Sequence, residues 1–182
     1  MATFGNTALS GDTTGSIENY IRGGYFQMGS INGIADSITA KIRITTSAKN
    51  CKCALYDSSN NLVDNGVTEE ITVPTQDATA TTFNFNTPKP VLTANAWYYI
   101  VVWAKSGLGS AYSYIYGEGG YGDYVDTETY NSYPVTWIPE ENNPYTIFAI
   151  YCTYTETAAA KQKFMGTTPG LSLLNPFNIG II

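Results

Sequence analysis

The chain has 182 residues, of which 43% are hydrophobic, 14% are aromatic and only 13% are charged, and its formal net charge is −6 with no histidine. Such an apolar composition excludes disorder of the whole chain, which goes with few apolar residues and much charge. The basic residues form no run, so the phosphate backbone of a nucleic acid, which needs clustered positive charge, is not an expected partner.

Strand patterns come first along the chain, at residues 20–28 and 36–46. In the second of these, every other residue is apolar, which is typical of a strand with one buried face. The apolar positions are Ile38, Ala40, Ile42 and Ile44. The same alternation returns at Phe83 and Phe85, whose neighbours Thr82 and Asn84 are polar.

A hairpin is predicted at residues 50–64, where the polar turn SSNN separates NCKCALYD from LVD. Cys51 and Cys53 are two residues apart in a strand and therefore share a face, so only one of them could bridge to Cys152. We expect buried free thiols and no disulfide that folding requires. The spacing matches no zinc pattern and no histidine is available, so no metal or other cofactor is predicted.

The segment WYYIVVWA, residues 97–104, is apolar on both faces. Trp97, Tyr99, Val101 and Trp103 lie on one side, and Tyr98, Ile100, Val102 and Ala104 on the other. A strand in a sandwich usually buries one face and leaves the other in water. A loop, a second sheet, another subunit or a ligand must therefore cover the second face.

Further strands are expected at residues 69–74, 80–86, 111–117 and 145–155, separated by Gly, Asn, Asp and Pro. Short strands at a spacing of about ten residues predict an all-β fold, a two-sheet antiparallel sandwich or jelly roll. We place the sandwich at residues 15–156, with an N-terminal arm at 1–14 and a C-terminal arm at 157–182. The one helical pattern is a short turn at residues 157–164.

Two motifs within about residues 35–105 resemble those of a known module. The hairpin pattern A-x-Y-D/S-x-x-G-x-L is followed by L-x-A-G-x-Y-Y/W in jelly-roll-like β-sandwich modules of virion and cell-surface structural proteins. The matching residues, within about residues 35–105, are Ala54, Tyr56, Asp57, Asn60 and Leu62, then Leu92, Ala94, Asn95, Trp97 and Tyr98. Asn60 and Asn95 stand in place of glycines and are expected at positive φ. The resemblance implies the fold and no particular ligand.

No enzyme is predicted, because the chain has no histidine. Histidine is the commonest general base and the usual partner of a Ser or Cys nucleophile. Carboxylates for glycoside hydrolysis or calcium binding could come from Glu118, Asp123, Asp126 and Glu128, but acidic side chains in a glycine-rich loop more often stay solvated. The absence of a leader pattern and of about 20 consecutive apolar residues predicts neither a signal peptide nor a membrane helix.

Residues 112–145 form a tyrosine-rich segment that either caps the sandwich or contacts a glycan or a protein. Rings with polar tips suit such contacts, and the candidate contact residues are Tyr112, Tyr114, Tyr116, Tyr121, Tyr124 and Trp137. The tail, residues 164–182, is apolar, and Pro176 prevents a long helix. Its candidate subunit-contact residues are Leu171, Leu173, Leu174, Phe177, Ile179, Ile181 and Ile182. In water they would expose on the order of several hundred Å², so they either pack on their own sandwich or dock on a neighbour.

We therefore predict a virion structural protein: a capsid-decorating, turret, spike-like or shell subunit. Its expected partners are copies of itself or other capsid or surface-lattice proteins, with a host glycan as a further candidate. One alternative is a carbohydrate-binding module that uses Trp97, Trp103 or Trp137 with the cluster at residues 112–124. Another is an extracellular or cell-surface adhesin or filament subunit whose arm adds a strand to the next copy.

Overall fold

The computed structural model describes residues 1–9, 13–116, 123–143 and 147–157. All regular secondary structure in these ranges is β-strand, which confirms the predicted fold class. The strands are β1 (Ala2–Gly5), β2 (Thr13–Ser16), β3 (Tyr20–Gln27), β4 (Gly33–Ile44), β5 (Lys49–Asp57), β6 (Leu62–Val67), β7 (Ile71–Val73), β8 (Gln76–Asn84), β9 (Val91–Leu92), β10 (Trp97–Ala104), β11 (Ala111–Tyr116), β12 (Asp123–Thr127), β13 (Glu141–Asn143), β14 (Ile147–Phe148) and β15 (Ile150–Glu156). The predicted helical turn lies, apart from Thr157, outside the described residues.

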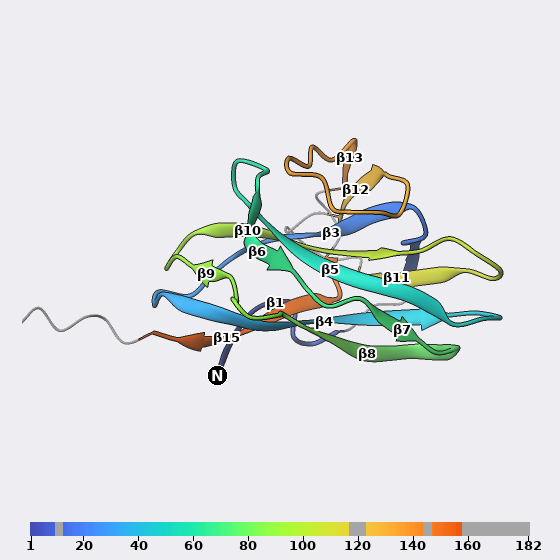
Figure 1. Ribbon diagram of the computed structural model, residues 1–182, viewed down its shortest axis with the longest axis horizontal. Coiled ribbons are helices and arrows are strands. Elements are labelled where there is room, and N and C mark those ends of the chain that lie inside the picture. The colour runs from blue at the N-terminus through green and yellow to red at the C-terminus, as the bar shows by residue number, and fades with distance from the viewer. Residues whose placement is uncertain (10–12, 117–122, 144–146, 158–182) are drawn as a thin grey trace, which may run out of the picture.

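Two antiparallel sheets pack as a sandwich, and Figure 1 shows them as two layers. The eight-stranded sheet has the order β1-β15-β4-β11-β14, with β2 paired to β11 and with β8 and β9 paired to β4. The seven-stranded sheet has the order β13-β12-β3-β10-β5-β6, with β7 paired to β5. The long strands β4 and β10 therefore lie in the middle of their sheets and supply the core.

Alternating side chains fill the space between the sheets. The four apolar residues predicted to face inward on β4 are all buried, and so are Phe83 and Phe85, while Thr82 and Asn84 are exposed. On β10, the face with Ile100 and Val102 belongs to this main core. The predicted alternation is thus confirmed in the eight-stranded sheet, with the exception of Thr39, which is also buried. Cys51, Cys53 and Cys152 are buried and free, as expected.

Turn residues adopt the predicted conformations. Asn60 has a φ of 65° and Asn95 a φ of 59°, in the left-handed region that glycine would otherwise occupy. In the β5–β6 turn, the Asp57 carboxylate accepts hydrogen bonds from the backbone N–H groups of Ser59 (2.8 Å) and Asn61 (2.9 Å). They add to the backbone bonds of the turn, in which the Asp57 N–H donates to the Asn61 carbonyl (2.9 Å) and the Asn60 N–H donates to the Asp57 carbonyl (3.0 Å).

The segment predicted as an N-terminal arm contributes strands to the eight-stranded sheet. Strand β1 pairs with β15, and β2 pairs with β11. Phe4 of β1 is buried in the main core, where its ring centroid lies 6.0 Å from that of Tyr154. A strand of four residues with one large apolar side chain shows too little alternation to be recognised in the sequence, so the sandwich begins earlier than residue 15.

Candidate functional site: an aromatic sheet face and an edge groove

A segment of the chain itself covers the second face of β10. Residues 128–140, between β12 and β13, lie over the outer side of the seven-stranded sheet (Figure 1). Their side chains build a second buried cluster on that side; its buried members are Ile21, Ala54, Tyr56, Val101, Trp103, Tyr133 and Trp137. The sequence left a loop, a second sheet, another subunit or a ligand as possible covers for this face. Over Val101 and Trp103 the cover is a loop of the chain itself.

Hydrogen bonds from the sheet hold this covering segment in place. The Tyr133 hydroxyl donates to the Lys52 carbonyl (2.9 Å), and the Tyr56 hydroxyl donates to the Pro134 carbonyl (2.9 Å). The Trp137 backbone N–H donates to the Asn60 carbonyl at 2.9 Å. The two tyrosine hydroxyls therefore find backbone partners, whereas the buried Nε1 atoms of Trp103 and Trp137 have none within the described residues.

A lysine also lies among these rings. The Lys52 ammonium is 4.6 Å from the ring centroid of Tyr130, 5.3 Å from that of Trp103 and 5.4 Å from that of Tyr133. It donates a hydrogen bond to the Asn131 carbonyl. Burial lowers the pKa of Lys52, although nearby Glu70 acts in the opposite direction. The cation and the ring faces therefore join the segment to β5.

Trp137, one of the predicted ligand contacts, is fully buried. Its ring packs against those of Tyr56 and Tyr99, with both centroid distances at 5.5 Å. Trp103 is buried too. Neither indole presents a face to which a sugar could stack, so the structure corrects Trp137 from an exposed contact to a core residue, and Trp97 is the tryptophan that stays accessible.

Beyond the covering segment, four half-buried rings form an aromatic row across β3, β10 and β12: Tyr25, Trp97, Tyr99 and Tyr124. Tyr25 stacks on Trp97 at 5.0 Å with an interplanar angle of 27°, and it lies 4.4 Å from Tyr99, its direct cross-strand partner. Tyr124 meets Tyr99 edge-on at 5.0 Å. Burial, and secondarily Tyr124, raises the pKa of Tyr99 to about 12, so its hydroxyl stays protonated at neutral pH.

The predicted tyrosine contacts do not gather in one place. Tyr112 lies on β11 in the eight-stranded sheet, as do the backbones of Tyr114 and Tyr116, whereas Tyr124 lies on β12 in the other sheet. Tyr121 and the seven apolar tail residues lie outside the described residues. Sequence reasoning missed Tyr25, which lies in the strand predicted at residues 20–28, because its place opposite Tyr99 depends on the pairing of β3 with β10.

Acidic side chains give little support for a metal site. Burial, then Glu140 and Glu128, raises the pKa of Asp126. Within residues 1–9, 13–116, 123–143 and 147–157, no group of three His, Cys, Asp or Glu side chains is placed to hold an ion. Glu118 is outside these ranges.

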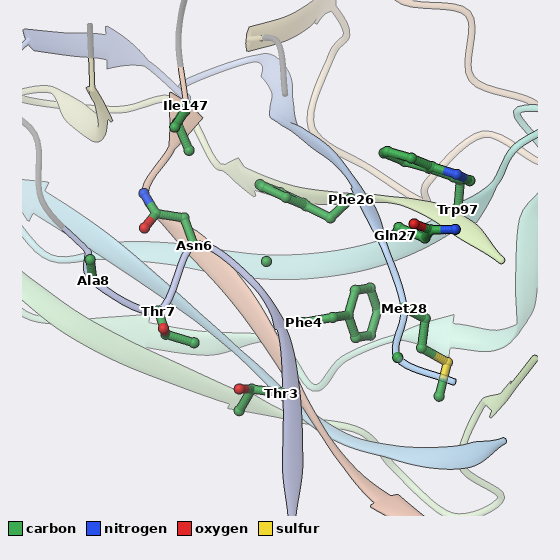
Figure 2. Close-up of a pocket in the computed structure, with 12 residues that line it drawn as sticks. Thr3, Phe4, Asn6, Thr7, Ala8, Phe26, Gln27, Met28, Trp97 and Ile147 are labelled. Atoms are coloured by element: carbon green, nitrogen blue, oxygen red, sulfur yellow. The ribbon is translucent and has the colours of Figure 1, made fainter. Parts of the chain in front are cut away.

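A groove of about 560 Å³ opens beside the aromatic row, between β1 and β3. It is lined by residues 3–8, residues 26–29, Trp97 and Ile147. Figure 2 shows Phe4 pointing from β1 toward Met28 on the other wall, with Trp97 and Gln27 at one end. This volume is in the range of ligand-binding pockets, and the groove combines an apolar floor with amide and hydroxyl groups at its rim.

Comparisons with protein-family models, curated protein sequences and solved structures gave no match. Within the described part of the chain, no helix is long and apolar enough to cross a membrane.

Proposed function

We propose that this protein is a structural subunit of a virion, such as a capsid-decorating, turret, spike or shell protein, whose sandwich is a rigid block and whose apolar tail docks on a neighbouring subunit. One observation carries the proposal. The described members of both buried clusters lie between Phe4 and Tyr154, and together they cover both faces of β10. The seven large apolar residues after Gly170 are a further apolar segment of the sequence, and we propose that they find their partner on a neighbouring subunit.

The character of the surface supports an assembly role. Only 13% of the residues are charged, and the exposed residues of the described part are mainly Thr, Ser and Asn. Interfaces between subunits are depleted in charge at their centres and enriched in aromatic residues, and the aromatic row has this character. An apolar surface of several hundred Å² is the size of an interaction patch, which agrees with a tail that binds another subunit.

The test places charge in the tail of the full chain. We expect Phe177→Asp with Ile181→Asp to stay folded and to lose assembly, because a charge in a dry contact is strongly unfavourable. Size-exclusion chromatography and negative-stain microscopy report the state of assembly. Leu108→Asp with Val135→Asp is the matched control, since these two exposed residues, at 82% and 77%, receive the same added charge elsewhere. A tail variant that assembles as the wild type does would refute the proposal.

The aromatic row favours a second candidate function, carbohydrate binding. Trp97 is half-buried at the end of the row, and protonated tyrosine hydroxyls lie beside it. Such rings stack on sugars while their polar tips donate hydrogen bonds. Carbohydrate binding would be favoured over assembly by two results together: the wild type stays monomeric and binds on a glycan array, and Trp97→Ala abolishes that binding. An array without a signal would remove it.

A further inference from the structure

Strand β6 departs from the regular ladder of the seven-stranded sheet over part of its length. Its pairing with β5 joins Leu62 to Tyr56 and Val67 to Ala54, so β6 advances five positions where β5 advances two. The three extra residues form a bulge, and bulges of this kind turn side chains out of the regular face of a sheet. Asn65, within the bulge, has a φ of 59°, in the left-handed region.

The bulge is one wall of a pocket between the two sheets. The pocket has a volume of about 530 Å³, and its opposite wall is formed by residues 89, 91 and 93, around β9 of the eight-stranded sheet. The two sheets are joined just after β6, where Thr68 forms a β-bridge with Phe85. We call this cavity the β6 pocket; its volume is in the range of sites for small ligands.

Six of the residues that line the β6 pocket have polar side chains: Asp57, Asp64, Asn65, Lys89, Thr93 and Tyr98. Hydrogen bonds fix three of these groups. One oxygen of the Asp57 carboxylate accepts the two backbone N–H groups of the β5–β6 turn described above, and the Lys89 ammonium donates to Asp36 at 2.7 Å. The Tyr98 hydroxyl accepts the Thr93 N–H at 2.9 Å. A carboxylate has a second oxygen, an ammonium has three donors, and a phenol both donates and accepts, so each fixed group can also bind a ligand.

The remaining lining residues are aliphatic. Leu62 and Val63 are half-buried, and Val91 is 72% exposed. Asp64 and Asn65, beside them in the bulge, are exposed. A ligand in this pocket therefore meets C–H groups as well as hydrogen-bonding groups.

The charges of the lining have both signs, which favours a neutral ligand. An anion would meet the carboxylates of Asp57 and Asp64, and a cation would meet the Lys89 ammonium, so either charge is opposed. An apolar ligand would displace water from the polar groups without replacing their hydrogen bonds. A neutral molecule with several hydroxyls avoids both costs, because each hydroxyl can donate to a carboxylate or accept from an amide or ammonium.

We propose that the β6 pocket binds a neutral sugar residue of a glycan, at a site separate from the aromatic row. Hydroxyls of the sugar bond to Asp64, Asn65 and the second oxygen of Asp57, while its C–H groups pack on Val63 and Val91. This site goes beyond the assembly function proposed above and does not depend on it.

The test measures glycan binding by the full chain and by variants in the bulge. The probe is an array of neutral glycans, and each signal is confirmed by saturation-transfer NMR with the free oligosaccharide. Asn65→Gly removes the amide and keeps the backbone, because glycine adopts positive φ without strain. Asn95→Gly is the matched control, since Asn95 also has a φ of 59° and is exposed, but lies outside the pocket. Asp64→Ala removes an exposed carboxylate.

We expect the wild type to bind at least one neutral glycan. Loss of a hydrogen bond to the sugar should weaken binding about fivefold in Asn65→Gly, and loss of one to a carboxylate should weaken it about tenfold or more in Asp64→Ala. Asn95→Gly should bind as the wild type does. Unchanged thermal melting shows that each variant is folded, and Asp64→Ala carries the test alone should Asn65→Gly not fold.

Three results would overturn the proposal. The first is a wild type that binds no glycan, which leaves the assembly function standing because that function is measured on the tail variants. The second is binding that Trp97→Ala abolishes and both bulge variants retain in full, since the sugar then lies on the aromatic row. The third is equal weakening in Asn65→Gly and Asn95→Gly, which would show that the effect does not come from the pocket.

Discussion

Replacing Trp137 by alanine should destabilise the whole sandwich. The indole is 0% exposed and lies between Tyr56 and Tyr99, so its removal leaves a cavity over the outer face of the seven-stranded sheet. Its Nε1 has no hydrogen-bond partner in the described structure, and the loss is therefore one of packing. Truncation of a buried tryptophan costs about 3–5 kcal/mol. In a chain of this size each kcal/mol lowers Tm by about 2–4 °C, so we expect a fall of about 6–20 °C.

Circular dichroism at increasing temperature measures the effect, with Val135→Ala as the control. Val135 lies in the same segment but is 77% exposed, and its truncation should change stability by less than about 0.5 kcal/mol. Both variants should melt in a single transition, since the segment is joined to β5 through Lys52 and Tyr133. A Tm of Trp137→Ala within about 1 °C of the wild type would show that residues 128–140 are not part of the cooperative unit, and the reasoning would be wrong.

The other predictions concern ionisable groups. Burial raises the pKa of Cys51 to about 12 and also raises the pKa values of Cys53 and Cys152. A thiol reagent at pH 8 should therefore leave the native protein unmodified and react with three thiols in denaturant. Rapid reaction of the native protein would contradict the burial of these thiols. Burial alone would raise the pKa of Asp36, but hydrogen bonds from Lys89 (2.7 Å) and Thr155 lower it below its usual value. The stability contributed by Asp36 is therefore present above pH about 4 and is lost as the pH falls through the folded-state pKa. Denaturant unfolding at pH 7 and pH 3 should accordingly show a smaller loss in Asp36→Asn than in the wild type, and equal losses would refute this.

Local patterns in the sequence were sufficient for the long strands and for the fold class. The alternation at residues 38–44 and at Phe83 and Phe85 follows from the period of two of a strand, which is independent of the partner strand. The positive φ of Asn60 and Asn95 follows from turn geometry over a few residues. The sequence also predicted that both faces of β10 are covered, because eight consecutive apolar or aromatic residues cannot leave one face in water.

The tertiary structure alone decided what covers that face and which residues meet there. Trp137 and Tyr56 are 81 positions apart, and whether an aromatic side chain is buried or exposed depends on such a long-range contact and not on its neighbours in the chain. The aromatic row needs the register between β3 and β10, which places Tyr25 opposite Tyr99. The groove needs β1, a strand too short to be recognised until its pairing with β15 is known. Pairing between distant segments depends on the packing energy of the whole sandwich, so no pattern within a single segment contains it.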